Sequence, residues 1–278
     1  MTGRWVSRLR AFLPELAAMY PAIRPVWRRA TILLHGSASR GLHDRWSDLD
    51  VWLWVPRRDL RRIDAASPTR FFECTLNGRE GHANADAREN VLAAVRACTF
   101  GLIHELRNAV VVRDPGGFGR RMIALARRPM RPALRRTLFF HHYVEMRGCH
   151  RNLDNPLNRG DRAAVFVALG TTLTHALRAA MVLDGEPPPY DKWLAHAAAG
   201  TPTGRIVVRR FARIMRLVGS GALNRRQAEV RHPVNLELRK IRADLVAAAH
   251  RKGIHDAWLG KWYLFIDQAR SVRERVRW

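Results

Sequence analysis

The stretch that decides the fold is residues 33–55, LLHGSASRGLHDRWSDLDVWLWV. It begins within the apolar run 30–35, which predicts a buried strand, and passes into a turn of small residues at 36–41. Residues 48–55 alternate between polar and apolar at first and then become wholly apolar. Pro56 and the arginine-rich run after it end this segment, so it predicts a second strand.

Two carboxylates open the second predicted strand. Because alternate residues of a strand point to the same face, Asp48 and Asp50 should project together, with Leu49 and Val51 turned into the core. Adjacent carboxylates repel each other, and a divalent cation removes that conflict. Magnesium suits such a site, since it is usually held by one or two carboxylates plus phosphate oxygens. The plain alternative is a solvated strand end.

The turn after the first predicted strand has the properties of an anion site. Gly36 lets the backbone approach a ligand closely, and the amides that follow it near a helix start can donate to an anion. Ser37 adds a hydroxyl for a phosphate oxygen. A Gly-Ser turn alone is usually an ordinary loop. Its pairing with the Asp48/Asp50 strand is more specific than either feature alone.

Together these residues resemble the polymerase-beta-like nucleotidyltransferase superfamily, whose signature is a strand ending in Gly-Ser followed by an Asp-apolar-Asp-apolar strand. The resemblance covers roughly residues 28–125 and implies that Asp48 and Asp50 bind one or two Mg²⁺ ions. It also implies nucleotide contacts from Gly36 and Ser37, and we assign the neighbouring Ser47 to the nucleotide as well. The implied enzyme transfers a nucleotidyl group from a nucleoside triphosphate, expected to be ATP, to an acceptor hydroxyl.

The third carboxylate of that family, a metal ligand or a base, usually lies on a later strand. Here it should lie in a hairpin predicted at 70–86, where Asn77-Gly78 is the turn signal. Glu73 and Asp86 are the two candidates, with equal weight. Glu80 is also available, and if Asn84 occupies the corresponding position, the third acid is missing.

The pattern changes near residues 127–132, beyond which only helical periodicity remains. The predicted fold class is therefore α+β: a mixed sheet with flanking helices, followed by an all-helical part. We expect a nucleotidyltransferase domain at 1–127 and a helical domain at 128–278. The run 187–194, PPPYDKWL, looks like that of bacterial members with a C-terminal helical domain.

Two side-chain groups in the helical part are further candidates. Lys192 follows a proline-rich turn and is expected to reach a triphosphate from a cleft between the domains, although an ordinary helix start explains it too. His142 and Glu145 share a helix face, close to His141 and His150, and could bind a metal. With no further ligand visible, packing is the favoured reading of these histidines.

The formal net charge of +25 on 278 residues favours polyanionic partners. RNA is therefore a possible acceptor, whereas a polycationic aminoglycoside fits the charge poorly. A protein hydroxyl is also possible, and the non-enzymatic alternative is a nucleotide- or nucleic-acid-binding regulator that lost the third acid. Uninterrupted apolar runs are too short for a membrane span, and the cysteine spacing supports neither a zinc site nor disulfides. We expect a cytoplasmic protein without a membrane partner.

Overall fold

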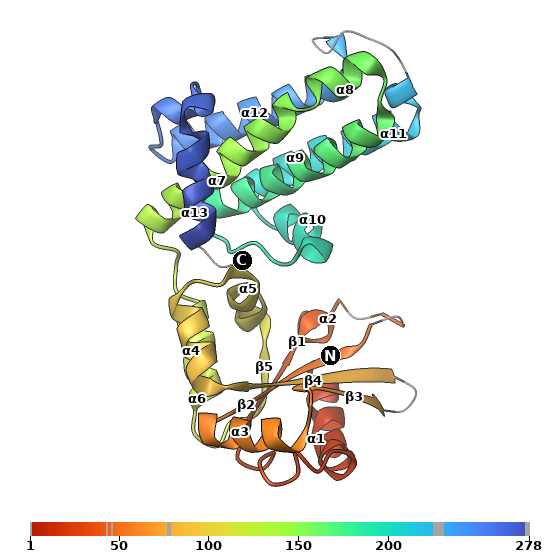
Figure 1. Ribbon diagram of the computed structural model, residues 1–278, viewed down its shortest axis with the longest axis vertical. Helices are drawn as coiled ribbons and strands as arrows, with labels where there is room; N and C mark the ends of the chain where they lie inside the picture. Colours follow the sequence, from red (N-terminus) through yellow and green to blue (C-terminus); the bar gives the residue numbers. More distant parts are fainter. Residues whose placement is uncertain (1, 43, 46, 77–78, 225–230, 276–278) are drawn as a thin grey trace. The chain divides into compact units, whose positions relative to one another are not determined.

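The computed structural model describes residues 2–275 except 43, 46, 77–78 and 225–230, and the chain divides into two compact units (Figure 1). The first unit spans Met1–Arg128 and the second Pro129–Trp278. The first contains a five-stranded sheet with flanking helices, and the described elements of the second are all helical. The predicted fold class is therefore confirmed.

The sheet has the strand order β3-β4-β2-β1-β5. Only β2 and β4 pair in parallel; the other neighbours are antiparallel. The Asn77-Gly78 turn signal lies outside the described residues, and the strands on either side of it pair as a hairpin. The strands are β1 (Thr31–His35), β2 (Leu49–Val55), β3 (Phe71–Leu76), β4 (Arg79–Ala87) and β5 (Val110–Arg113).

Helices cover both faces of this sheet. The face that carries Leu34, Val51 and Ala83 packs in one buried core with residues of α1 and α3. The opposite face carries Leu33 and Trp54, which pack with residues of α4, α5 and α6. The helices of this unit are α1 (Thr2–Met19), α2 (Gly36–Ser39), α3 (Arg57–Ala66), α4 (Arg88–Arg96), α5 (Phe100–Asn108) and α6 (Phe118–Ala126).

Several boundaries in this unit differ from those expected. Strand β2 begins at Leu49, so Asp48 precedes it by one residue. Helix α1 continues through Pro14, which was expected to kink or break it. Helices α3 and α6 were not predicted. In α3 most residues are charged, and its apolar side consists mainly of Leu60 and Ile63, too few to show a clear period.

In the second unit, α9 is the central helix and contacts α7, α10, α11 and α12. By length and composition it could cross a membrane, but 56% of its most apolar segment is buried inside the protein, as in the core helix of a globular unit. The α-helices are α7 (Pro132–Arg151), α8 (Asp154–Arg159), α9 (Arg162–Leu183), α10 (Asp191–Ala199), α11 (Pro202–Gly219), α12 (Pro233–Arg251) and α13 (Ile266–Arg275). Short 3₁₀ turns are η1 (Ala222–Asn224), η3 (Ala257–Leu259) and η4 (Trp262–Phe265).

The spacing of apolar residues over 234–273 predicts one long helix, but the structure divides this segment into α12, two 3₁₀ turns and α13. Helix α12 ends at Arg251, and the chain reverses through Gly253, which has a positive φ of 74°. Glycine adopts this left-handed conformation without the steric cost paid by other residues. The apolar residues after it belong to separate short elements, although their spacing continues the helical pattern.

Candidate active site on the sheet

A row of polar side chains crosses four strands at one end of the sheet. Strand pairing places His35 beside Asp50, Asp50 beside His82, and His82 beside Glu73. Residues directly opposite each other in neighbouring strands project to the same face, with strands about 4.8 Å apart. This is also the face of Leu33 and Trp54. The row therefore gathers two histidines and two carboxylates from strands far apart in sequence.

Asp48 lies on the same side as Asp50 but one residue before β2, and its side chain is 37% exposed. The His82 imidazole lies between two carboxylates. Its Nε2 is 3.9 Å from Asp48 Oδ2 and 4.0 Å from Glu80 Oε2. Two residues of β4, His82 and the acid Glu80, therefore lie beside the predicted aspartate pair.

The Gly-Ser turn contacts the aspartate strand directly. Gly36 has a φ of +70°, and a Cβ at this position would lie 2.2 Å from Asp50 Oδ2. A side chain here would therefore strain the backbone and collide with the carboxylate. The glycine is needed for the close approach of the turn to Asp50, a reason different from the predicted contact with phosphate.

The backbone amide of Gly36 is occupied by a buried acid. It donates to Glu105 Oε2 at 3.0 Å, and Arg40 forms an ion pair with the other oxygen of Glu105 at 3.4 Å. Arg40 Nε also donates to the Gly36 carbonyl at 3.2 Å. The Gly36 amide itself is therefore engaged within the protein, and the predicted phosphate contact through Gly36 and the amides after it remains a prediction. Glu105 comes from α5, and no local pattern links it to this turn.

The two predicted serine contacts remain predictions. Ser37 is buried, with 6% of its surface exposed, so a phosphate oxygen would have to reach into the turn to meet its hydroxyl. Ser47 is held in a local turn: its hydroxyl donates to Asp44 Oδ1 at 2.9 Å and accepts from the Asp44 amide at 3.0 Å. This turn shapes the approach to Asp48 from the loop side.

The structure separates the candidates for the third carboxylate. Asp86 is paired with Trp54, four residues along the strand from the Asp50 row, which corresponds to about 13 Å. Its Oδ1 accepts from the Ala87 amide and from Asn90 at the start of α4. A role for Asp86 beside Asp50 is therefore not supported by its position, because it holds the start of a helix instead.

Glu73 and Glu80 both project to the face that carries Asp50, but they lie at different distances from the two aspartates. Glu73 is exposed and lies on β3, two strands from Asp50. Glu80 lies on β4, the immediate neighbour of β2, and continuation of the register sets it beside Asp48. Asn84, the other candidate for the third position, pairs with Trp52, two residues beyond Asp50. Of these positions, Glu80 is the best placed to share a cation with Asp48.

A cavity of about 410 Å³ opens on the same face, beyond the polar row. Its aromatic wall is Trp52 and Trp54, whose rings stack with centroids 5.2 Å apart, and Trp52 stacks on His35 at 3.9 Å. Its polar lining includes Asn84 and Asp86. Trp54 is buried, as expected for a core residue, whereas Trp52 is only partly buried and offers a flat surface to a ligand.

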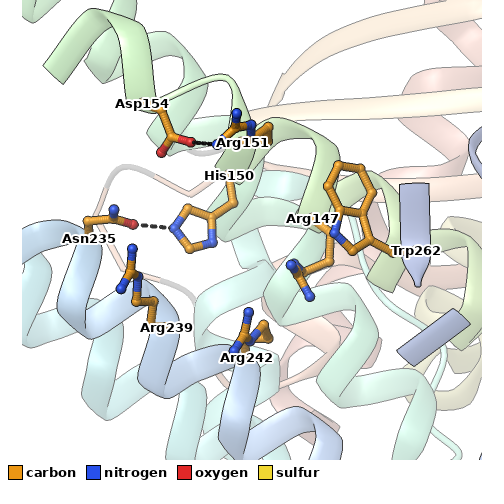
Figure 2. A pocket seen from close by; sticks show the side chains of 8 residues that line it. All are labelled: Arg147, His150, Arg151, Asp154, Asn235, Arg239, Arg242 and Trp262. Carbon is orange, nitrogen blue, oxygen red and sulfur yellow. Dashed lines mark hydrogen bonds and ion pairs between the residues drawn. The ribbon is translucent and has the colours of Figure 1, made fainter. Parts of the chain in front are cut away.

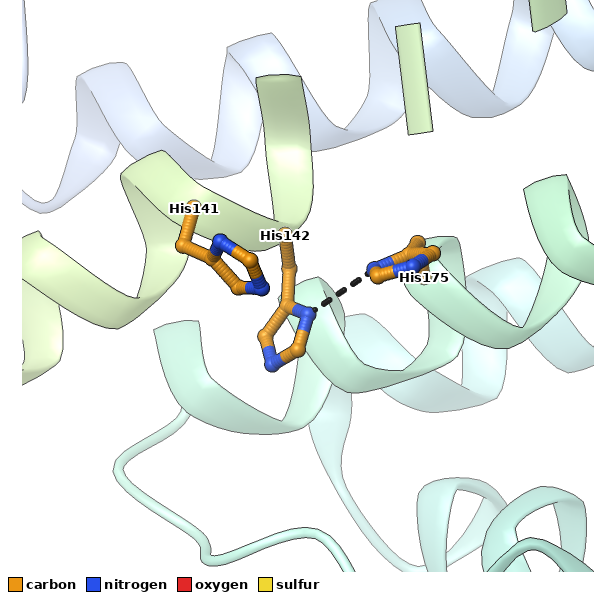
Figure 3. A group of neighbouring side chains, drawn as sticks. All are labelled: His141, His142 and His175. Carbon is orange, nitrogen blue, oxygen red and sulfur yellow. Dashed lines mark hydrogen bonds between the residues drawn. The ribbon is translucent and has the colours of Figure 1, made fainter. Parts of the chain in front are cut away.

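The two candidates in the helical unit, Lys192 and His142, lie in different environments, one exposed and one buried. Lys192 is exposed in the first turn of α10, beside Asp191, which pairs with Arg178 at 2.8 Å. Its proposed contact with a triphosphate remains a prediction. His142 does not pair with Glu145 in the hydrogen bonds of the described residues; its Nδ1 lies 3.0 Å from His175 Nδ1 (Figure 3).

His141, His142 and His175 form a cluster whose ring nitrogens lie within 4.8 Å of one another. This is close enough to hold one metal ion. Burial lowers the pKa of His142 well below its usual value, and His175, His141 and Arg178 act in the same direction. His141 Nδ1 donates to the Ala269 carbonyl at 2.8 Å. We assign the cluster to core packing, because the charge of Arg178 opposes a cation here.

No protein-family model matches this sequence, and no curated protein is detectably similar to it. Among solved structures, the chain is similar to a nucleotidyltransferase-like protein from Exiguobacterium sibiricum. The two are 10% identical, the match covers 92% of this chain and 80% of the other, and the TM-score is 0.46.

Proposed function

We propose that the sheet unit transfers a nucleotidyl group from a nucleoside triphosphate, ATP in the first instance, to an acceptor hydroxyl. The observation that supports this most directly is the close approach of Gly36 to the Asp50 carboxylate, next to Asp48 and Glu80 at one end of the strands β2 and β4. In this reaction the acceptor oxygen bonds to the α-phosphorus, the bond to the β-phosphate oxygen breaks, and pyrophosphate leaves. The acceptor proton passes to a base, for which Glu80 is the best-placed carboxylate.

The acids at this site fit a magnesium ion. In a protein of formal charge +25, the ion pairs of the described residues give Asp48 and Glu80 no arginine or lysine partner, only His82. Hard oxygen donors suit Mg²⁺, which is usually held by one or two carboxylates together with phosphate oxygens and water. Asp48 and Asp50 would hold the ion, with Glu80 beside them. When bound, it would neutralise charge on the phosphates and the leaving group.

The residues of the chain have separate tasks in this proposal. The Glu105–Arg40 pair stabilises the turn at Gly36. This turn packs against Asp50 at the beginning of β2. His82 lies between Asp48 and Glu80, with its Nε2 within 4.0 Å of both carboxylates. The cavity beside Trp52 offers a surface on which a base can stack.

One observation favours a second candidate. The residue of β4 directly beside Asp50 is His82 and not an acid. If Glu80 does not complete the site, the unit would bind a nucleotide without transferring it, as in a regulatory protein. Among acceptors, RNA agrees best with the net charge, and an aminoglycoside agrees least.

The decisive experiment incubates the full chain with α-³²P-labelled ATP, Mg²⁺ and separate pools of RNA, protein and small molecules. Asp48→Asn and Asp50→Asn should each lower transfer by about 10²–10³-fold, because each removes several kcal/mol of charge stabilisation. Asp267→Asn is the matched control, since Asp267 is exposed on α13, outside the sheet unit, and pairs with Arg270. Label in one pool with wild type and Asp267→Asn alone identifies the acceptor class.

Equal transfer by the Asp50→Asn variant would overturn the proposed site. No transfer by wild type, together with ATP binding that depends on Asp48 and Asp50, would support the nucleotide-binding alternative. Circular dichroism of each variant checks that the fold is kept.

A further inference from the structure

A basic pocket of about 230 Å³ lies within the helical unit, between α7, the start of α8, α12 and η4 (Figure 2). It has no part in the proposed reaction at the sheet. Its lining is dominated by guanidinium groups and contains one aromatic ring. The lining residues are Arg147, His150, Arg151, Asp154, Asn235, Arg239, Arg242 and Trp262.

Helical spacing brings these side chains together. On α7, Arg147 and Arg151 are four residues apart and therefore lie on the same face. On α12, Asn235, Arg239 and Arg242 are separated by four and three residues and share the facing side. Two helices that are adjacent in space thus present their arginine faces to a common cavity.

Two polar contacts hold the walls of the pocket. His150 Nε2 and Asn235 Oδ1 form a hydrogen bond that joins α7 to α12 (Figure 2). The guanidinium of Arg147 lies 5.3 Å from the ring centre of Trp262 and donates to the Tyr143 hydroxyl at 3.4 Å. These contacts join the two helices and fix the side chain of Arg147 before any ligand is present, which lowers the entropic cost of binding.

The charges in the pocket are not balanced. Arg151 pairs with Asp154, the one carboxylate in the lining. Arg147, Arg239 and Arg242 belong to none of the ion pairs found among the described residues. Burial lowers the pKa of Arg147, and the charge of Arg242 acts in the same direction. Like charges held together at a partly buried site are unfavourable, and a bound anion would relieve that cost.

We propose that this pocket binds the phosphoryl group of a nucleotide or of a nucleic acid strand, between Arg147, Arg239 and Arg242. Guanidinium groups suit phosphate because their planar fork donates two hydrogen bonds to neighbouring oxygens. The Trp262 ring in the same lining provides a face for a base or for the guanidinium that stacks on it. Asp154 stays on Arg151, so its carboxylate is neutralised at the edge of the site.

The test compares two double variants that remove equal charge. Arg239→Gln/Arg242→Gln alters the pocket, whereas Arg209→Gln/Arg213→Gln alters exposed residues of α11 that do not line it. Binding is measured on the full chain by titration with inorganic pyrophosphate and ATP, and by fluorescence anisotropy with a short labelled oligoribonucleotide. The pocket variant should lose about tenfold or more in affinity, and the control less than about threefold.

The ligands then distinguish the two sources of the phosphoryl group. Tight pyrophosphate or ATP binding that depends on the pocket arginines indicates a free nucleotide, and weak small-anion binding with strong RNA binding indicates a strand. An equal loss of affinity in the two double variants would overturn the proposal, because it would show only a response to net charge. Trp262→Leu provides a separate check: it should weaken RNA or ATP binding more than pyrophosphate binding, because it removes a stacking surface as well as the contact that fixes Arg147.

Discussion

The two units of this protein collect charge of opposite sign by different means. In the sheet unit, the acids that meet at the proposed metal site include Asp48 and Asp50, two residues apart at the beginning of β2. In the helical unit, the arginines of the pocket come from positions 147–151 and 239–242, on helices separated by almost ninety residues. An acidic pair at strand spacing is visible in a sequence, whereas a basic pocket built from two helices is not.

The comparison also shows which charges are left unneutralised. In a strongly basic chain, an exposed acid without an arginine partner is unexpected, and Asp48 and Glu80 are such acids among the described ion pairs. An arginine without an acid is ordinary on this surface, but three around one cavity are costly. Both sites therefore suggest ligands of the opposite sign: a divalent cation at the sheet, and a phosphoryl group between the helices.

After the two aspartates, the largest effect expected inside the sheet site comes from its glycine. Gly36→Ala should lower nucleotidyl transfer by about a hundredfold or more, because a Cβ would collide with Asp50 and shift it. Gly41→Ala is the matched control: its φ is +71°, but no atom lies within 4 Å of its added Cβ. Both variants should cost about 1–3 kcal/mol of stability from backbone strain. Equal activity of the two would show that the contact with Asp50 has no functional role.

A smaller effect should identify the third acid. Glu80→Gln should weaken Mn²⁺ binding, used as a spectroscopic probe for Mg²⁺, by about tenfold, since it removes one charged ligand near Asp48. Glu73→Gln lies one strand further away and should change it by less than about threefold. Asp86→Asn should leave metal binding unchanged and lower the melting temperature slightly, because Asp86 holds the start of α4. A larger loss in Glu73→Gln than in Glu80→Gln would restore Glu73 as the third acid.

The smallest expected effect concerns pH and the helical unit. The folded-state pKa of His142 is lowered by burial and by His175, His141 and Arg178, so this group stabilises the fold fully above its unfolded pKa of about 6.5. That stability is lost as the pH falls below this value. The melting temperature of the wild type should decrease by several degrees between pH 7 and pH 5.

The His142→Gln variant supplies the control for that measurement. It should melt at a lower temperature at pH 7 but show a shallower decrease with pH, since the proton uptake is removed. A residual slope is expected because the pKa values of His150 and His232 are also lowered, first of all by burial. Identical slopes in the two proteins would mean that His142 is not neutral in the folded state.

Much of the fold could be predicted because its elements have strong periods. The strand of Asp50, the hairpin, and the long helices of the second unit appear close to the expected positions. The short charged helix α3 and the division of the final helix could not be predicted in the same way. The first has only a narrow apolar side, and the second depends on one glycine at position 253.

Only the part of the site whose residues are close together in the sequence could be predicted. The alternation of Asp48 and Asp50 and the position of Gly36 follow from strand and turn chemistry. His82 and Glu80 become neighbours of Asp48 through the parallel pairing of β2 with β4, which no short motif encodes. Glu105 reaches the turn from a helix 69 residues later. A sequence pattern has no information about such contacts.

The parallel pairing of β2 with β4 has a consequence for how the protein folds. The β3–β4 hairpin is local and its residues meet early, while Asp50 and His82 are separated by α3 and β3 along the chain. Pairing at such separation must first overcome loop-closure entropy. We therefore expect β2 and β4 to pair after the hairpin has formed, and the proposed metal site to exist only after this pairing. An ion bound by residues of both strands would slow their separation and stabilise the folded sheet.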